Sequence, residues 1–254
     1  MGYSIAVINQ KGGVGKTTTV VNLAAYLAKL KYRVLVVDID PQGNATSGLG
    51  VNKQDVNLGT KELILGNISL EQAILNVQEG IYLIPTEQSL ATLELQLAQY
   101  KDREYKLRQG LQYSDYDYII IDCPPALSLL TVNALTAADG VLIPVQTEYY
   151  ALEGLSQLLE VIQLVRNGLN PDLDLLGVLL TMYDSRTSLS EQVKTEVLNY
   201  FGDKVFTTLI PRNVRLAEAP SHGKTINNYD KWSKGARAYR QLAKEVQQRL
   251  STLL

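Results

Sequence analysis

The stretch YSIAVINQKGGVGKTTTVVNLAAYLAKL, residues 3–30, joins a short apolar run to a helical pattern through a glycine-rich loop. The glycines at 12, 13 and 15 let the backbone wrap closely, so that several N–H groups can point inward at phosphate oxygens. The helix that begins at Lys16 adds the positive end of its dipole. A strand, a loop of this kind and a helix in this order predict a phosphate-binding loop.

The end of this loop supplies two side chains suited to a nucleotide bound with a metal ion. Lys16 can reach the β- and γ-phosphates, and the hydroxyl of Thr17 can ligate Mg²⁺. The strict pattern G-x-x-x-x-G-K-[ST] is not met, because Gln10 stands where its first glycine belongs. Lys11 follows instead, so the loop carries two lysines five positions apart.

The rest of the chain alternates between strand and helix patterns, which predicts an α/β fold with a mostly parallel, twisted sheet flanked by helices on both faces. We expect this P-loop fold to form one domain over residues 1–254, because no linker-like stretch divides it. The expected strands are 3–9, 33–40, 80–85, 116–124, 140–146, 173–183 and 204–211. The expected helices are 16–31, 86–110, 131–138, 151–167, 188–201 and 233–252.

Ligands of such sheets lie beyond the carboxyl ends of the strands. This rule brings the segments 9–18, 38–44, 122–128, 144–150 and 182–186 to one edge. Carboxylates at this edge, facing the phosphate loop, suit both the positioning of a water and the holding of Mg²⁺. Aspartates at strand ends also cap loops and helices, but several at one edge favour a functional site.

Composition limits the remaining possibilities. The 254 residues carry a net charge of −2, and a single cysteine excludes a disulfide framework within the chain and fits a reducing compartment. We expect neither a signal peptide nor a membrane span from the apolar patterning. The charge is uneven: residues 1–180 hold 12 basic against 19 acidic side chains, and residues 181–254 hold 12 against 7. A basic final third is either a solvated face or a surface for a polyanion.

The segment KGGVGKTT, residues 11–18, resembles the deviant Walker A motif of the ParA/MinD class of P-loop ATPases. This resemblance implies ATP and Mg²⁺ as cofactors and an ATP-dependent homodimer. It assigns Lys11 to the phosphates of the partner subunit, where a cation in trans would act as an arginine finger does. The nucleotide-binding residues that it implies in the loop are Lys11, Gly12, Gly13, Val14, Gly15, Lys16, Thr17 and Thr18.

Two further segments resemble the same class. In VLVVDIDPQGNATSGLG, residues 34–50, the resemblance assigns the attacking water and water-mediated contact with Mg²⁺ to Asp40, with Asp38 as the weaker candidate. YIIIDCPP, residues 118–125, resembles a Walker B strand and the switch after it, which makes Asp122 an acceptor for a Mg²⁺-bound water. The catalytic residues implied are thus Lys11, Lys16 and Asp40.

The segment IPRNVRLAEAPSHGKTI, residues 210–226, is similar to the small ParA branch often called Soj. In that branch the equivalents of Pro211 and Asn213 lie against the adenine, and Met182 is a further candidate. An apolar clamp with one or two polar edges is what an adenine site requires.

The Soj branch binds DNA without sequence preference, and the matching residues here are Arg186 and Arg215. Nearby charge adds the weaker candidates Lys224, Lys234, Arg237 and Arg240. Phosphate contacts alone suffice for such binding. We expect no helix-turn-helix ahead of the first strand. The resemblance also implies double-stranded DNA and a ParB-type centromere-binding protein as partners, no membrane, and a cytoplasmic, nucleoid-associated location.

Related classes of P-loop protein offer alternatives to this interpretation. A MinD-like membrane-associated ATPase and a ParA-like positioner of a protein cargo stay open, although the stripe on 233–254 lacks the bulky residues of a membrane anchor. A metabolic carboxylate–amine ligase is a third class. One cysteine is too few for a nitrogenase iron protein, and the end QQRLSTLL lacks the tyrosine cluster of an autophosphorylating kinase. The single histidine, His222, excludes a metal site built on several histidines.

Overall fold

The apolar runs form a seven-stranded sheet in the computed structural model, which describes residues 2–86, 90, 92–149 and 154–251. The strand order is β3-β4-β2-β5-β1-β6-β7, and every neighbouring pair is parallel except β3 and β4. The strands are β1 (Tyr3–Val7), β2 (Val34–Asp38), β3 (Leu75–Gln78), β4 (Ile81–Ile84), β5 (Tyr118–Asp122), β6 (Gly140–Gln146) and β7 (Asp174–Thr181).

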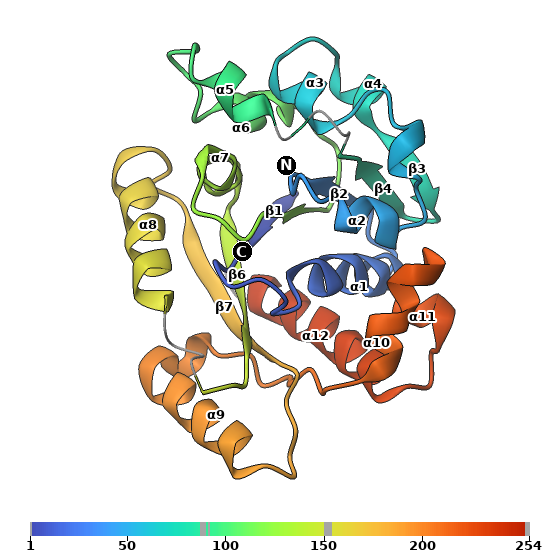
Figure 1. Cartoon of the computed structure of the whole chain (residues 1–254), viewed down its shortest axis with the longest axis vertical. Coiled ribbons are helices and arrows are strands. Elements are labelled where there is room, and N and C mark those ends of the chain that lie inside the picture. The colour runs from blue at the N-terminus through green and yellow to red at the C-terminus, as the bar shows by residue number, and fades with distance from the viewer. Residues whose placement is uncertain (1, 87–89, 91, 150–153, 252–254) are drawn as a thin grey trace.

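Helices cover both faces of this sheet (Figure 1). The longer ones are α1 (Lys16–Lys29), α7 (Leu129–Ala137), α8 (Leu155–Gly168), α9 (Ser188–Phe201) and α12 (Lys234–Ser251). The short α-helices are α2 (Asn44–Gly48), α3 (Thr60–Ile64), α4 (Leu70–Ala73), α5 (Leu93–Leu97), α6 (Lys106–Gly110), α10 (Val214–Glu218) and α11 (Ile226–Tyr229). Short 3₁₀ turns span Lys53–Asp55, Gly202–Lys204 and Ala219–His222.

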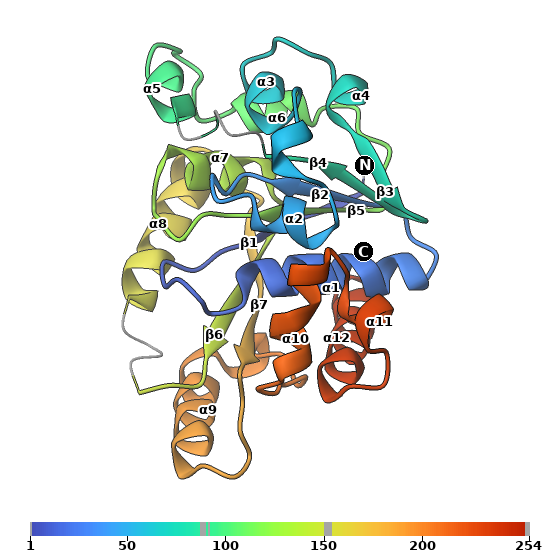
Figure 2. The same ribbon diagram turned by 45° about the vertical axis from the view of Figure 1, so that its right-hand side comes forward.

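The sheet separates two apolar cores. Figure 2 shows α1, α10, α11 and α12 on one side of the sheet and α3 to α6 on the other. In β2, Leu35 and Val37 belong to the core under α3 to α9, whereas Val34 and Val36 belong to the core under α1 and α12. Alternate side chains of a strand face opposite sides of a sheet, so a strand buried on both sides reads as a continuous apolar run. The predicted α/β, mostly parallel fold is confirmed.

The predicted strand over 204–211 is wrong. This segment runs beside β7 but forms only isolated bridges, at Val205 and Pro211. Between them, the carboxylate of Glu245 on α12 accepts the N–H groups of Thr207 and Thr208 at 2.7 and 2.9 Å. The N–H of Phe206 donates to β7 at the carbonyl of Val178, so that of Thr208, two residues later, would be the next donor to β7 in a continuous ladder, and the α12 carboxylate takes it instead.

The predicted helix over 86–110 is also wrong, because the described part of this range holds the separate helices α5 and α6. The amide of Asn133 on α7 donates to the carbonyl of Arg103 at 2.8 Å and accepts the N–H of Leu107 at 3.1 Å. These bonds fix a break before α6 that the apolar pattern conceals. The β3–β4 hairpin at the sheet edge was likewise not predicted.

The carboxyl ends of the central strands come together at one edge. Asp122, at the end of β5, is in register with Asp38 at the end of β2 and with Val7 at the end of β1. The loop that follows β1 leads from this edge into α1. Among the described residues, no helix has the length and apolarity needed to cross a bilayer.

Candidate nucleotide-binding site

The loop between β1 and α1 is held open by its glycines. Gly13 and Gly15 have φ of 75° and 91°, in the left-handed region that other residues avoid. The carbonyl of Val14 accepts the hydroxyl of Thr181, at the end of β7, at 2.8 Å. The protein itself therefore fixes the curvature that turns backbone N–H groups toward a bound anion.

Lys16 lies buried inside this loop. Its Nζ donates to the carbonyl of Lys11 at 3.1 Å, so its stem crosses the loop from one end to the other. Burial lowers the pKa of Lys16, while the nearby charges of Asp122 and Asp40 oppose this shift. A buried ammonium among carboxylates suits an anionic ligand such as a nucleotide phosphate.

Thr17 and Asp122, the residues expected to hold Mg²⁺, lie side by side. The Thr17 hydroxyl donates to Oδ2 of Asp122 at 2.7 Å, while Oδ1 of the same carboxylate is buried without a hydrogen-bond partner. Burial raises the pKa of Asp122 well above its usual value, and the charge of Asp38 adds to the shift. An orphaned buried acceptor beside a hydroxyl fits a hydrated Mg²⁺, which keeps several waters and takes few protein ligands.

The described residues contain no cluster of three or more His, Cys, Asp or Glu side chains able to hold a metal alone.

Asp38 and Asp40 have different surroundings. The carboxylate of Asp38 accepts the N–H and hydroxyl of Thr46 at 2.7 and 2.6 Å, and burial raises its pKa to about 6. Asp38 thus holds α2. The carboxylate of Asp40 is bonded only locally, with Oδ1 accepting the N–H of Gln42 at 2.9 Å. The Asp40 carboxylate therefore holds no other element in place, unlike that of Asp38, and its role with an attacking water stays a prediction.

Lys11 lies at the rim of the loop with its side chain 44% exposed. Its Nζ lies 3.5 Å from Oε2 of Glu148, and Oε1 of the same carboxylate lies 3.6 Å from Nη2 of Arg212. Glu148 was missed in the sequence analysis, although its segment was expected at this edge. Within one chain, the Lys11 side chain is therefore paired with the Glu148 carboxylate, and Lys16 is the lysine whose side chain lies inside the phosphate loop.

The three predicted adenine contacts lie together. Met182, Pro211 and Asn213 line one cavity of about 370 Å³. Its other lining residues are Gly15, Thr18, Thr181, Ile210, Arg212, Val214, Leu216, Ala217 and Tyr239. The cavity is mostly apolar and adjoins the phosphate loop, which is the arrangement that an adenine nucleotide requires.

Tyr239 reaches this cavity from α12. Its hydroxyl shares a hydrogen bond of 3.2 Å with that of Thr19 on α1. Burial raises the pKa of Tyr239 above its usual value. Helix α12, which lies in the basic last third of the chain, thus contributes both to the apolar core and to the lining of the cavity around Met182.

Arg186 and Arg215 are exposed and each is paired within the chain. Arg186 forms a bidentate pair with Asp184, and Nη1 of Arg215 lies 2.9 Å from Oε2 of Glu218. A second carboxylate, that of Asp230, lies 3.6 Å from Nε of Arg215. The two arginines are therefore accessible, but partly neutralised.

The weaker basic candidates do not form one group with them. Lys224 lines a separate cavity of about 370 Å³ beside Thr17 and Thr18. Arg237 and Arg240 line a groove of about 480 Å³ on α12, and Lys234 is the first residue of that helix. The further side chains of this groove are Tyr26, Lys29, Leu30, Asn227, Lys231, Trp232, Ala236 and Lys244.

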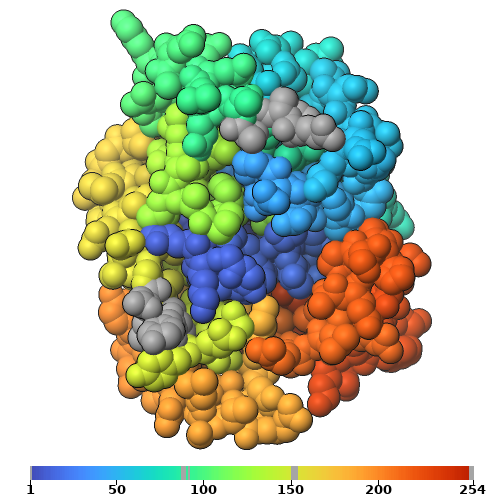
Figure 3. Space-filling view, in the orientation of Figure 1, coloured from blue at the N-terminus to red at the C-terminus, as the bar shows by residue number. Residues whose placement is uncertain are grey.

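The face that carries the phosphate loop is seen in Figure 3, where the blue N-terminal segment reaches the surface beside the orange C-terminal segment. Tyr149 is 76% exposed, whereas its neighbour Tyr150 lies outside the described residues.

Comparison with known proteins identifies a matching family and several similar proteins. A family model described as an AAA domain matches residues 2–175. The sporulation initiation inhibitor protein Soj of Bacillus subtilis is 57% identical over 249 residues, covering 97% of this chain and 98% of its own length. The chromosome-partitioning ATPase Soj of Thermus thermophilus is 54% identical, covering 97% of this chain and 96% of its own.

A similar solved structure is titled cobyrinic acid a,c-diamide synthase from Mycobacterium smegmatis with bound ADP and magnesium. It is 39% identical, with a TM-score of 0.88, covering 100% of this chain and 97% of its own. The phosphate loop and sheet described above, together with Soj relatives similar over nearly their full length, show that this chain is an ATPase of the Soj/ParA family.

Proposed function

We propose that this protein is an ATP-dependent DNA-partitioning ATPase that acts as a dimer. The observation that carries the proposal is the division between the two loop lysines. Lys16 is buried within the loop, whereas Lys11 is half-exposed at its rim and directed to Glu148. A lysine placed outside its own phosphate site is available to a second subunit.

Nucleotide binding uses the residues gathered at the sheet edge. The loop backbone and Lys16 hold the phosphates, and Met182, Pro211 and Asn213 hold the adenine. Mg²⁺, when bound beside Thr17 and Asp122, would neutralise charge on the phosphate oxygens. Two protomers meet with their phosphate loops facing, and Lys11 leaves Glu148 for the nucleotide of the partner subunit.

Hydrolysis needs a water aligned with the terminal phosphate and a cation to stabilise the transition state. The carboxylate of Asp40 orients that water, and Lys11 in trans supplies the cation. Turnover thus requires the dimer, and loss of the terminal phosphate returns monomers.

The dimer binds DNA through Arg186 and Arg215, with the α12 side chains Lys234, Arg237 and Arg240 and the nearby Lys224 as additional phosphate contacts. Such contacts are independent of base sequence. A ParB-type partner stimulates hydrolysis and releases the dimer, which would drive segregation of a chromosome or plasmid in the nucleoid.

The decisive test is binding of the purified protein to unrelated DNA duplexes with ATP, a non-hydrolysable analogue, ADP or no nucleotide, over a salt series. We expect binding only in the triphosphate state, equal for all sequences, with log K falling by about 0.9 per phosphate contact for each tenfold rise in salt. Failure to bind any duplex, with ATP-dependent capture by anionic liposomes instead, would move the protein to the MinD-like alternative.

A further inference from the structure

The two segments that line the adenine cavity lead directly into the two exposed arginines. Met182 precedes Arg186 by four residues, and Asn213 precedes Arg215 by two. The segments are joined by backbone hydrogen bonds, since the N–H of Tyr183 donates to the carbonyl of Ile210 at 3.0 Å and the carbonyl of Tyr183 accepts the N–H of Arg212 at 3.1 Å. Each segment that lines the adenine cavity therefore continues directly into a segment that carries one of the arginines proposed to bind DNA.

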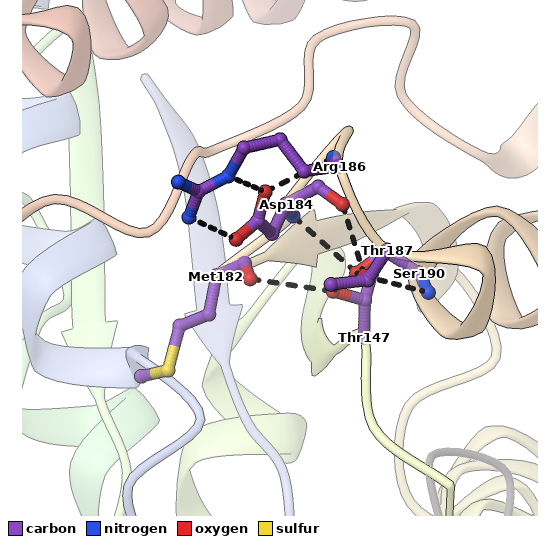
Figure 4. A network of polar contacts seen from close by, with 6 residues as sticks. All are labelled: Thr147, Met182, Asp184, Arg186, Thr187 and Ser190. Atoms are coloured by element: carbon purple, nitrogen blue, oxygen red, sulfur yellow. Dashed lines mark hydrogen bonds and ion pairs between the residues drawn. The ribbon is translucent and has the colours of Figure 1, made fainter.

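On the first segment, the carboxylate of Asp184 accepts three hydrogen bonds from Arg186 (Figure 4). Nε and Nη2 of the guanidinium donate to Oδ1 and Oδ2 at 2.9 and 2.7 Å, and the backbone N–H of Arg186 donates to Oδ1 at 3.0 Å. The Arg186 side chain is 86% exposed and that of Asp184 is 21% exposed. The arginine thus lies outward of its carboxylate, open to solvent.

The position of Asp184 is set by a loop anchored at the cavity. The Thr147 hydroxyl lies 3.4 Å from the carbonyl of Met182 and 3.2 Å from Oγ of Ser190, which accepts the N–H of Asp184 at 3.3 Å. Met182 has a φ of 51°, which is unusual for a residue with a side chain. In Figure 4 its side chain points away from these polar contacts.

The pair remains charged throughout the physiological range. The guanidinium of Arg186 holds the pKa of Asp184 well below its usual value, and the backbone N–H of Arg186 and the charge of Arg212 lower it further. A carboxylate and a phosphate use the same pair of guanidinium N–H groups, so Arg186 cannot make its bidentate contact with both at once.

We propose that Asp184 is an internal competitor for the DNA phosphate at Arg186, and that it lowers affinity for DNA most strongly when no nucleotide fills the adenine cavity. The inference rests on the proposed function. Its structural basis is that the competing carboxylate lies between Met182, which lines the cavity, and Arg186, which faces solvent.

The test substitutes Asp184→Asn, which keeps the size of the side chain and an oxygen able to accept the Arg186 N–H but removes the charge. Asp172→Asn is the matched control, because Asp172 is exposed, precedes the opposite end of β7 and gives the same change in net charge. Binding is measured by the fluorescence anisotropy of a labelled duplex without nucleotide, with ADP and with a non-hydrolysable ATP analogue, at fixed salt.

We expect Asp184→Asn to bind DNA about 1.5- to fivefold more tightly without nucleotide, the range for loss of one exposed ion-pair competitor. The gain should be smaller with the ATP analogue, so that the contrast between nucleotide states shrinks. In an Arg186→Ala background, Asp184→Asn should bring no gain, since the carboxylate acts only through that arginine.

Equal affinities of Asp184→Asn and Asp172→Asn, or a gain that persists in the Arg186→Ala background, would overturn the inference while leaving the proposed function intact. A parent protein that binds no duplex even with the ATP analogue would instead overturn the proposed function, and the role of Asp184 with it. Thermal unfolding of each variant separates either result from misfolding.

Discussion

Individual residues of the phosphate site divide into those that hold the loop and those that await a ligand. Lys16 and Val14 have partners within the chain, whereas one oxygen of Asp122 has none. The first group could be predicted from the motif, because spacing within a loop fixes their positions. The partners Thr181 and Glu148 could not, because the strand-end rule brings their segments to this edge of the sheet but does not fix which side chains meet there.

Replacement of Lys11 by alanine tests its proposed role. Lys11→Ala should bind ATP nearly as the parent does but lose dimerisation, with turnover falling by roughly 10³-fold, the lower end of the contribution of an arginine finger. Steady-state hydrolysis and sedimentation velocity measure the two effects.

The matched control is Lys31→Ala, which removes another exposed lysine paired with a glutamate, at 3.5 Å from Glu79. If Lys11→Ala dimerises and hydrolyses ATP as the parent does, Lys11 contributes to neither dimerisation nor hydrolysis.

Asp122 allows a prediction about stability. Its pKa is raised on folding, so the folded state retains a proton that the unfolded chain releases above about pH 4, and the free energy of unfolding falls as pH rises toward the raised value. Asp122→Asn removes this loss. We expect the nucleotide-free variant to be more stable than the parent by about 1–3 kcal/mol at pH 7, with a smaller difference near pH 4.

Urea unfolding across this pH range checks the sign. Repeating it with ADP and Mg²⁺ should show less ligand-induced stabilisation in the variant. If the parent is instead more stable than Asp122→Asn at pH 7 without nucleotide, the charged carboxylate of Asp122 does not destabilise the folded state.

At the scale of elements, the strand and helix patterns predicted the sheet well where a segment is buried on both sides. They failed where a polar side chain from another element takes the backbone donors. Glu245 withdraws residues 204–211 from the sheet, and Asn133 interrupts 86–110. Such interactions are invisible to periodicity, because they depend on which helix packs nearby.

The apolar stripe of α12 is buried, and it faces α1 within the core shared by the two helices. Leu242→Ala should therefore lower the free energy of unfolding by about 2–5 kcal/mol through the cavity that it leaves. Gln241→Ala, one residue earlier on the exposed side, should change it by no more than about 0.5 kcal/mol. Denaturant unfolding of both variants decides, and equal midpoints would place α12 outside the cooperative core.

At the scale of the whole molecule, the nucleotide residues gather at one sheet edge, while the basic side chains of the last third spread over the α9 loop, α10 and α12. The uneven charge along the sequence was compatible with either a solvated face or a polyanion surface, and it did not show which basic residues lie side by side. Arg186 and Arg237 prove to belong to different parts of the surface, on the loop before α9 and in the α12 groove. A dimer could present both parts to one duplex.

Asp40→Ala tests the complete cycle. The variant should bind ATP and dimerise but not hydrolyse, and so accumulate as dimers that stay on DNA after free ATP is removed. Dissociation from an immobilised duplex, followed after a wash without nucleotide, should be slower than for the parent. Parent-like hydrolysis by this variant would remove Asp40 from the mechanism.

The bond from Thr181 to the carbonyl of Val14 has a consequence for the speed of the cycle. It ties the phosphate loop to the end of β7 before any nucleotide arrives. A loop that is already ordered loses little conformational freedom on binding, so capture of a fresh nucleotide needs no slow rearrangement. We therefore expect the exchange of ADP for ATP in a protomer to be limited by the dissociation of ADP rather than by the binding of ATP.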